Sequence, residues 1–493
     1  MIQVVNPGTG ALLAQLPEGS RDEAQAAVER ARRAQPAWAS LSFTQRARGL
    51  RRLARLLRDD ARLLDLLTSE SGKPLYEAVV FELLYTLELM RFYTSGQGRR
   101  ALSPELRASF LFPNKRTRVV YHPRGVVCVI GPWNWPLLNN FADAIAPLLA
   151  GNAVVLKPSE WTPLSSLRVA ELWRQAGLPQ DVFQVVTGRA EAGRALVESC
   201  DMVFFTGSHA AGREVAKAAA ERMIPAVLEL GGKSAMIVLR DADLPRAARA
   251  AVWSGFAHSG QVCIRTERVF VEEPVADEFI ALCAAETKRL QHGPAADPEV
   301  FDVGAITFPP QMTRAQAQIA DAVAHGASLL SGGTRATRAG NFFPPTLLAN
   351  ATTDMQVMTE ETFGPVLPIM RVQSAEEALQ LTNANAAGLS GSVWSADAEK
   401  ARALAERMQA GSVCVNDVLF NYLCVAAPLG GWKASGLGTR HGVESLRQFC
   451  RMQTVLVDRP GFAWISAVVA RVFGFPYDAR VLKVARWLIR RVY

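Results

Sequence analysis

The strongest constraint on the fold is an alternation of short, β-branched apolar runs with helix-like stretches, which begins after residue 125. Apolar runs of this length favour buried strands, and the intervening segments have helical spacing. This alternation predicts a parallel sheet with helices on both faces, an architecture that binds nucleotides at the carboxyl ends of its strands. We expect strands at 126–130, 153–156, 182–186, 202–206 and 226–230, and helices at 162–176, 190–198 and 209–222.

A second alternating region follows and predicts a second α/β lobe. A chain of 493 residues exceeds the size of a single core, so roughly two or three lobes are expected. Helical spacing of Ala, Arg and Leu also predicts helices over 20–70. In the second lobe we expect strands at 234–239, 268–271 and 366–370, and helices at 244–258, 313–325, 375–383 and 397–408.

Composition and charge exclude several classes of protein. The seven cysteines are scattered and form neither a disulfide framework nor a C-x-x-C metal pattern, which predicts a cytoplasmic protein without a metal site. The first residues lack the features of a signal peptide, and Pro, Asn and Asp interrupt the apolar region 126–156, so no transmembrane span is expected.

Of the net charge of +8, +6 lies in 459–493. The remainder carries no basic stripe, so no nucleic acid is expected.

Two segments have features of a nucleotide site. Gly207 and Ser208 follow an expected strand and open a helix, whose free N–H groups can hold a phosphate. The alternative interpretation is that Ser208 only caps the N-terminus of the helix. Lys157 and Glu160 also follow a strand and can bind ribose hydroxyls, while a surface turn around Pro158 is the alternative. The fingerprint G-x-G-x-x-G is absent, so neither segment alone identifies the site.

Two further segments carry potential catalytic groups. Glu229 lies inside an apolar strand, where burial raises a carboxyl pKa into the range of a general base. An edge position facing water is the alternative. Cys263 follows a glycine turn and is flanked by Arg265 and Arg268, which we expect to favour the nucleophilic thiolate. An inert core cysteine is the alternative for this segment taken alone.

Together these segments resemble the aldehyde dehydrogenase superfamily in order, spacing and local sequence, from about Asn6 to about Val457. The interval of 34 residues between Glu229 and Cys263 also resembles that of the family. The motifs are Pro132-Trp133-Asn134-Trp135-Pro136, Lys157-Pro158-Ser159-Glu160, Phe205-Thr206-Gly207-Ser208, Leu228-Glu229-Leu230-Gly231-Gly232-Lys233-Ser234, Gly260-Gln261-Val262-Cys263, Glu360-Glu361-Thr362-Phe363-Gly364-Pro365, and Asn416 with Gly430-Gly431-Trp432-Lys433-Ala434-Ser435-Gly436.

The resemblance implies NAD(P)-dependent oxidation of an aldehyde to a carboxylic acid. It makes Cys263 the nucleophile and Glu229 the general base that hydrolyses the thioester, while Asn134 donates to the oxyanion with the backbone N–H of Cys263. Loss of one such donor typically costs about 3 to 4 kcal/mol of transition-state stabilisation. The implied cofactor-binding residues are Trp133, Lys157, Ser159, Glu160, Gly207, Ser208, Gly212, Leu230, Gly231, Glu361 and Phe363.

The resemblance also implies how the chain is organised. It implies a Rossmann-like NAD domain at 1–105 and 122–230, a catalytic α/β domain at 231–419, and a small β bridging element at 106–121 and 420–458. Strand pairing through that bridge makes a homodimer or homotetramer. NAD is favoured over NADP because Glu160 repels a 2′-phosphate, and NADP stays open because Lys157 can pair with one.

The substrate is left open by the sequence, which combines features of fatty (class 3-like) and semialdehyde dehydrogenases. Trp135, Val262, Ile264, Tyr422 and Leu423 suggest an apolar pocket, whereas a carboxylated substrate such as succinic semialdehyde requires an arginine there. A CoA-acylating enzyme has no need of a hydrolytic base, so Glu229 argues against it. A non-enzymatic role tolerates loss of the catalytic groups, which are all present.

The segment 459–493 is a separate, basic tail. Residues 462–473 are almost entirely apolar, and 474–476 interrupt them. Beyond that break, one side of the expected helix is basic and the other apolar, with a tryptophan near the boundary, which suits the surface of an anionic bilayer. Peripheral membrane contact and packing against a dimer partner both stay open. The basic side carries Arg480, Lys483, Arg486, Trp487 and Arg490, and the apolar stripe Val481, Val484, Ala485, Leu488 and Val492.

Overall fold

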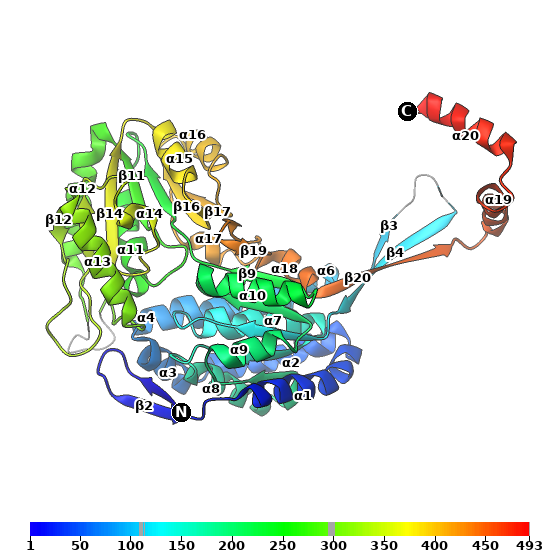
Figure 1. Ribbon diagram of the computed structural model, residues 1–493, viewed down its shortest axis with the longest axis horizontal. Coiled ribbons are helices and arrows are strands. Elements are labelled where there is room, and N and C mark those ends of the chain that lie inside the picture. The colour runs from blue at the N-terminus through cyan, green and yellow to red at the C-terminus, as the bar shows by residue number, and fades with distance from the viewer. Residues whose placement is uncertain (108–111, 113, 294–300, 493) are drawn as a thin grey trace. The chain divides into compact units, whose positions relative to one another are not determined.

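The computed structural model describes residues 1–107, 112, 114–293 and 301–492 (Figure 1). The chain divides into two compact units. The first comprises Met1–Ala101 and Pro123–Phe449, and the second comprises Leu102–His122 and Cys450–Tyr493. The first unit contains two large sheets, and the candidate site lies within it.

The first sheet has six strands in the order β19-β9-β8-β5-β6-β7, all parallel except β19. Helices α1, α9 and α10 cover one face, and α7 packs on the other. Alternate side chains of β5 therefore enter opposite layers, which explains why the whole strand is buried. The elements are β5 (Val126–Ile130), β6 (Ala153–Lys157), β7 (Phe183–Val185), β8 (Met202–Thr206), β9 (Ala226–Glu229), β19 (Gly436–Leu437), α1 (Arg21–Ser40), α7 (Ala142–Ala150), α8 (Leu164–Gln175), α9 (Ala190–Val197) and α10 (His209–Glu221).

The second sheet has seven strands in the order β12-β13-β14-β11-β10-β16-β17, and only β12 is antiparallel. Met236 packs with α11 and α12, whereas the adjacent Ile237 packs with α13, α15 and α16 on the other face. The elements are β10 (Ala235–Val238), β11 (Arg268–Glu272), β12 (Ser328–Ser331), β13 (Thr346–Ala349), β14 (Val366–Val372), β16 (Ser390–Trp394), β17 (Ser412–Val415), α11 (Leu244–Phe256), α12 (Ala276–Arg289), α13 (Pro310–Ala324), α14 (Gln356–Thr359), α15 (Ala375–Asn383) and α16 (Ala398–Ala405).

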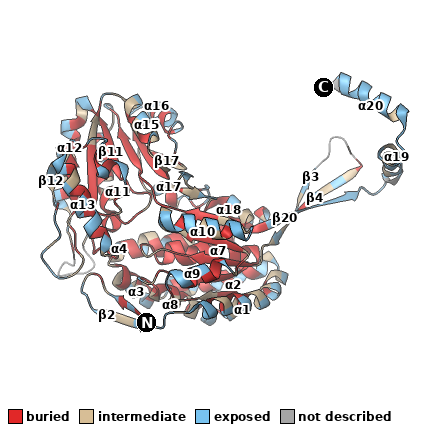
Figure 2. Ribbon diagram, viewed as in Figure 1, coloured by how far each residue is buried: buried red, intermediate tan, exposed pale blue. Residues whose placement is uncertain are grey.

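Shorter elements complete the first unit, and Figure 2 shows both sheets buried beneath helices with exposed outer faces. Two of the elements, η1 and η2, are π-helical turns. The elements are β1 (Ile2–Val5), β2 (Leu12–Leu16), α2 (Phe43–Arg58), α3 (Ala61–Ser71), α4 (Leu75–Glu77), η1 (Ala78–Leu84), α5 (Tyr85–Tyr93), α6 (Gly96–Ala101), η2 (Leu137–Phe141), η3 (Gln180–Val182), η4 (Ala257–Gly260), η5 (Glu273–Val275), β15 (Ala387–Gly388), α17 (Phe420–Leu423), β18 (Trp432–Lys433) and α18 (Gly442–Gln448).

The second unit has a three-stranded sheet in the order β20-β4-β3, followed by two helices. Almost all of β20 is exposed. None of the helices in the described ranges is both long and apolar enough to cross a membrane. The elements are β3 (Glu105–Arg107), β4 (Lys115–Pro123), β20 (Cys450–Asp458), α19 (Ala463–Phe473) and α20 (Ala479–Val492).

The predicted fold class, two α/β lobes with parallel sheets and a small β element, is confirmed. Strands β5 and β8 have the predicted bounds. The predicted helix 244–258 instead ends at Phe256, because His258 and Ser259 have positive φ. The division by contacts also differs from the expected bridge: residues 420–449 lie in the first unit, where β19 pairs with β9 and α18 packs on α7.

Candidate active site

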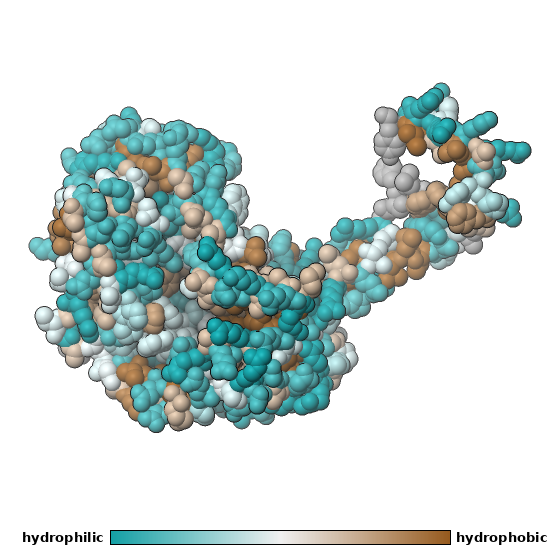
Figure 3. Space-filling model, viewed as in Figure 1, coloured by the Kyte–Doolittle hydropathy of each residue, from teal (hydrophilic) through white to brown (hydrophobic). Residues whose placement is uncertain are grey.

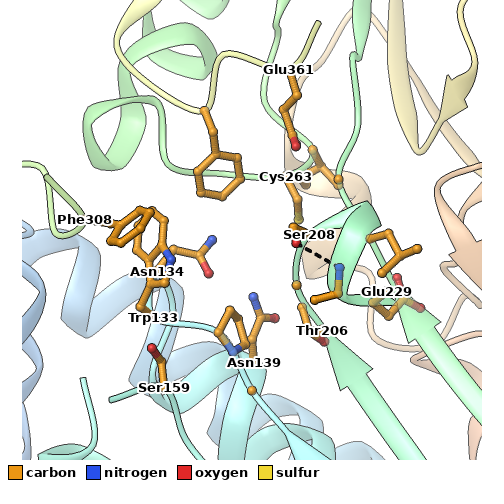
Figure 4. A pocket seen from close by; sticks show the side chains of 18 of the residues that line it. Trp133, Asn134, Asn139, Ser159, Thr206, Ser208, Glu229, Cys263, Phe308 and Glu361 are labelled. Carbon is orange, nitrogen blue, oxygen red and sulfur yellow. Dashed lines mark hydrogen bonds between the residues drawn. The ribbon is translucent and has the colours of Figure 1, made fainter. Parts of the chain in front are cut away.

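A cavity of about 510 Å³ lies beside the carboxyl ends of the strands of the six-stranded sheet. Figure 4 shows its side chains, with Asn134, Cys263 and Glu361 pointing into the same space. The residues predicted from the sequence that line it are Trp133, Asn134, Lys157, Ser159, Glu160, Gly207, Ser208, Glu229, Leu230, Gly231, Cys263, Glu361 and Phe363. Segments far apart in the sequence therefore meet around one thiol.

The thiol is presented by a turn with unusual backbone geometry. After α11 the chain places His258, Ser259 and Gly260 at φ values of 47°, 55° and 73°. Left-handed backbone costs a non-glycine residue about 1 kcal/mol or more. A Cβ on Gly260 would lie 2.2 Å from the carbonyl oxygen of Gly364, so glycine is required for this close approach. The turn redirects the chain toward the cavity within a few residues.

Buried hydrogen bonds hold that turn against the loop that carries Asn134. The side chain of Gln261 donates to the carbonyl oxygen of His258 at 3.0 Å and accepts from the N–H of Thr307 at 2.9 Å. Asn134 Nδ2 donates to the carbonyl oxygen of Gln261 at 2.8 Å. These bonds fix the Asn134 amide beside the segment that carries Cys263, the position that an oxyanion donor requires.

A buried ion pair supports the Asn134 loop from behind. Lys73 Nζ contacts a carboxylate oxygen of Glu82 and also donates to the carbonyl oxygen of Asn134 at 3.0 Å. The other oxygen of Glu82 accepts from the N–H groups of Leu137 and Leu138 at 2.7 and 3.1 Å. Both charged side chains are fully buried. Removing either would leave an uncompensated buried charge, so the pair fixes this loop firmly.

The charge around Cys263 differs from the prediction. Cys263 is half-buried, and burial raises its pKa to about 12, while Arg440 has the largest opposing effect. The prediction that Arg265 and Arg268 favour the thiolate is wrong. Arg265 pairs with Glu267 at 2.6 Å, and Arg268 donates to the carbonyl oxygen of Lys233 at 3.1 Å. Both guanidinium groups are engaged in the core, because they are buried and need partners there.

Glu229 is the last residue of β9 and is only 5% exposed. Burial raises its pKa to about 8, Arg440 lowers it, and Asp143 raises it further. The predicted raised pKa is therefore confirmed, and the alternative of a water-facing edge residue is excluded. A carboxyl group with a pKa near neutrality suits proton transfer.

Several residues that the sequence predicts to bind the cofactor line the cavity, among them Lys157 and Ser208. Lys157 is buried at the end of β6, where its Nζ donates to the carbonyl oxygens of Pro158 and Gly188 at 2.9 and 2.7 Å. Ser208 is the N-cap of α10, since its Oγ accepts from the N–H of Ala211 at 3.3 Å. Ser208 therefore caps the helix, as the alternative interpretation predicted, and it also lines the cavity. Gly212 is not among the residues that line this cavity.

Glu361, Trp133 and Phe363 also line the cavity. Glu361 accepts from the N–H of Gly232 at 3.0 Å, and burial raises its pKa to about 7. The rings of Trp133 and Phe363 meet edge to face at 5.5 Å. A Cβ on Gly231 would lie 2.2 Å from Glu361. Glycine at this position therefore leaves room for the carboxylate.

Several cavity residues are missing from the sequence prediction. Phe308 packs against Trp133 with ring centroids 5.6 Å apart, and it lies in an irregular segment without a periodic signal. Arg440 follows the glycine-rich motif near the end of the first unit, but its sequence neighbours give no sign of burial beside Glu229. The residues of this kind include Gly131, Asn139, Trp161, Ala211, Phe308, Gln311, Arg314, Leu389, Leu429 and Arg440.

A second, smaller cavity of about 50 Å³ also reaches Cys263, and its walls are apolar. All five residues predicted for an apolar pocket line it. Among its described lining residues none carries a charge, and Asn139 and Tyr422 supply polar groups. The lining residues are Phe81, Trp135, Leu138, Asn139, Ala257, Val262, Cys263, Ile264, Leu419, Tyr422 and Leu423.

Comparison with known proteins identifies relatives over nearly the whole chain. The model of the aldehyde dehydrogenase family matches residues 1–455. A Mycolicibacterium smegmatis protein provisionally named succinate-semialdehyde dehydrogenase (NADP+) is 39% identical over 456 residues, 92% of this chain and 87% of that protein. The 4,4'-diapolycopene aldehyde oxidase of Methylomonas sp is 38% identical over 485 residues, 97% of this chain and 88% of that protein.

A solved structure agrees with these relatives. The aldehyde dehydrogenase of Mycobacterium tuberculosis complexed with NAD+ matches with a TM-score of 0.88 and 34% identity, and the match covers 93% of this chain and 95% of that one.

Proposed function

Because the chain belongs to the aldehyde dehydrogenase family and oxidises an aldehyde with NAD(P), we propose that Cys263 is its nucleophile, Glu229 its general base and Asn134 its oxyanion donor. The observation that carries this proposal is that all three line one cavity. The hydrogen bond from Asn134 to the backbone of Gln261 supports it, because it keeps the amide beside the thiol.

The chemistry follows from these groups. The thiolate of Cys263 attacks the aldehyde carbon, and the N–H groups of Asn134 and Cys263 stabilise the oxyanion. Bound NAD(P)+ supplies the acceptor for the hydride that leaves this carbon. Loss of the hydride converts the adduct into a thioester on Cys263. Glu229 then takes a proton from water, the resulting hydroxide attacks the thioester, and the carboxylic acid and the thiol separate.

Substitution of the two groups separates the two half-reactions. Cys263→Ala should abolish NADH formation, because no adduct forms. Glu229→Gln should give a burst of about one NADH per site and then stall, since the amide accepts no proton. Stopped-flow absorbance measures both. In the unchanged enzyme, hydrolysis should rise with pH through about 8, where Glu229 loses its proton. Normal steady turnover of Glu229→Gln would refute its role as the base.

The cavity residues suit NAD(P). The first turn of α10, which begins directly after Ser208, suits an anion, and the proximity of Lys157 and Glu160 suits ribose hydroxyls. Glu361, which also lines the cavity, offers a carboxylate to a second ribose. The other residues proposed for cofactor binding are Trp133, Ser159, Gly212, Leu230, Gly231 and Phe363. Gly212 acts indirectly, because a Cβ there would meet Leu230 at 2.5 Å.

We infer that Glu160 favours NAD over NADP. Glu160 lines the cavity three residues after Lys157, where its carboxylate would repel a 2′-phosphate. Glu160→Gln should raise kcat/KM for NADP relative to NAD by about tenfold, the effect of roughly 1.4 kcal/mol. Steady-state kinetics with both cofactors measure the ratio. An unchanged ratio would place the 2′-position of the ribose elsewhere.

The substrate proposed for this enzyme is an uncharged, apolar aldehyde. The smaller cavity at Cys263 has apolar walls and no cationic lining residue among those described. A carboxylated aldehyde would lose hydration there without gaining a partner. The Methylomonas relative, named for an aldehyde of diapolycopene, supports this choice over the semialdehyde of the mycolicibacterial name.

An NADH-formation screen tests the substrate class. We expect a long-chain alkanal and an aromatic aldehyde to have kcat/KM at least about a hundredfold above that of succinic semialdehyde, because leaving a carboxylate unpaired costs several kcal/mol. Val262→Arg, which introduces a cation into the apolar wall, is the matched variant and should reduce this preference. Efficient oxidation of succinic semialdehyde by the unchanged enzyme would contradict the proposal.

We also infer a cytoplasmic homodimer or homotetramer. The seven cysteines are all free thiols, which supports a reducing compartment. Strand β20 lies at the edge of its sheet and exposes Met452 and Leu456 by 71% and 56%. An exposed edge strand with apolar side chains favours pairing with another strand. The pairing proposed here is with a second copy of the chain.

The tail after β20 is proposed to contact a membrane surface. Helix α20 carries five basic residues and no acidic one, and it exposes Leu482 and Ile489 by 54% and 59%. On α19, Trp464 and Phe473 are 69% and 67% exposed. Figure 3 shows apolar and polar side chains next to each other on this segment. A basic amphipathic helix of this kind suits an anionic bilayer.

Sedimentation with phosphatidylserine-containing vesicles tests the tail. The full chain should bind at low salt and dissociate as salt rises, because each surface-bound cation contributes about 1 kcal/mol. A chain ending at Asp458 should stay in the supernatant. A full chain with Arg480, Lys483, Arg486 and Arg490 changed to Gln is the control that keeps the apolar residues. Equal sedimentation of all three would leave the tail with only a structural role.

A further inference from the structure

Arg440 lies between two buried acids, Glu229 and Asp143, at the edge of the catalytic cavity. Its backbone is fixed by a two-way bridge to Leu429, with N–H to O distances of 2.9 and 2.8 Å. The residue is 3% exposed. A guanidinium at this depth needs partners, and those partners define what it does.

Neutral groups hold two of the three guanidinium nitrogens. Nη1 donates to Asn139 Oδ1 at 2.6 Å and also to the hydroxyl of Tyr422. Nη2 donates to Thr206 Oγ1 at 2.8 Å and lies 3.5 Å from Asp143 Oδ2. Because these contacts come from separate segments, the plane of the guanidinium has a single orientation.

The third nitrogen, Nε, faces Glu229. It lies 3.8 Å from Glu229 Oε1, and in the described part of the chain neither atom has a hydrogen-bond partner. A small rotation of the Glu229 side chain would complete a hydrogen bond between them. Glu229 also lines the cavity. One end of its carboxylate can therefore face Arg440 while the other stays available to a water molecule at the thioester.

We propose that Arg440 is a positioning residue, which orients the Glu229 carboxylate with one oxygen toward the guanidinium and the other free for the cavity. The inference rests on the proposed role of Glu229 as the base. A charge-assisted contact of this kind is stronger than a neutral one, so it restrains a carboxylate whose buried Oε1 has no hydrogen-bond partner in the described structure.

The charges around the pair make two opposite predictions. Arg440 lowers the pKa of Glu229, whereas Asp143 raises it, and burial raises the pKa of Asp143 itself to about 6. Removing the cation and removing the second acid should therefore change the ionisation of Glu229 in opposite directions. The titratable groups that face this cluster are Tyr85 and Tyr93 from α5, Asp143 from α7, Cys263, Tyr422 from α17 and His441.

The test is the pH dependence of hydrolysis of preformed acyl-enzyme, so that altered thiol reactivity does not enter. Arg440→Gln should slow hydrolysis at pH 7 by about tenfold and move the midpoint of its pH profile up by about one unit, the effect of roughly 1.4 kcal/mol. Asp143→Asn should move the midpoint down. Arg440→Lys keeps the charge and should leave the midpoint close to that of the unchanged enzyme.

An Arg440→Gln enzyme whose midpoint equals that of the unchanged enzyme would overturn the inference, because a purely structural role would change the rate without moving the profile. If Arg440→Gln does not fold, the other two variants test the inference. An Asp143→Asn enzyme whose midpoint is unchanged or higher would overturn the inference. So would an Arg440→Lys enzyme whose midpoint rises by the amount expected for Arg440→Gln. Failure of the base assignment is distinguishable, since Glu229→Gln would then turn over normally.

Discussion

The catalytic cavity depends on the left-handed turn that follows α11. Two non-glycine residues and Gly260 adopt positive φ in succession, and the backbone of Gly364 leaves no room for a Cβ at Gly260. Such backbone costs free energy and persists only where its surroundings over-determine it. Here the buried side chain of Gln261 donates to the carbonyl oxygen of His258 in the turn and accepts from the N–H of Thr307 in a distant segment. The result is a thiol held at a defined place between the two sheets.

Buried charge orients the groups around that thiol. The Lys73–Glu82 pair fixes the loop that carries Asn134, and Arg440 lies against Glu229. Buried ion pairs contribute little net stability, because desolvation offsets their attraction. Their value here is therefore in orientation and in the ionisation of Glu229, the proposed base. The apolar wall at Cys263 adds to this, because a low dielectric strengthens every remaining electrostatic contact.

Much of the architecture follows from the sequence, because buried parallel strands have a simple pattern. Strand β5 is apolar throughout and has helices on both faces, so its bounds can be read directly. The motifs also predicted Glu229 and Cys263 as site residues, and both line the same cavity. The end of α11 was harder to predict from the sequence, because nothing in Ala257-His258-Ser259 indicates positive φ.

The sequence could not predict which side chains from distant segments contact the site residues. Arg265 and Arg268 flank the thiol along the chain, yet their side chains turn into the core, and Arg440 reaches the site from a distant segment. Neighbours in space are set by sheet packing, which a local pattern does not encode. Phe308 likewise enters the cavity from an irregular segment.

If oxidation passes through an acyl group on Cys263, rapid-quench mass spectrometry will detect that group. The unchanged enzyme is mixed with NAD+ and a long-chain alkanal, quenched in acid within the first turnover, and digested. We expect the peptide containing Cys263 to gain the mass of the acyl group, and no other cysteine peptide to gain it. Product formation with an unmodified Cys263 peptide at every time point, or acylation of another cysteine, would contradict this expectation.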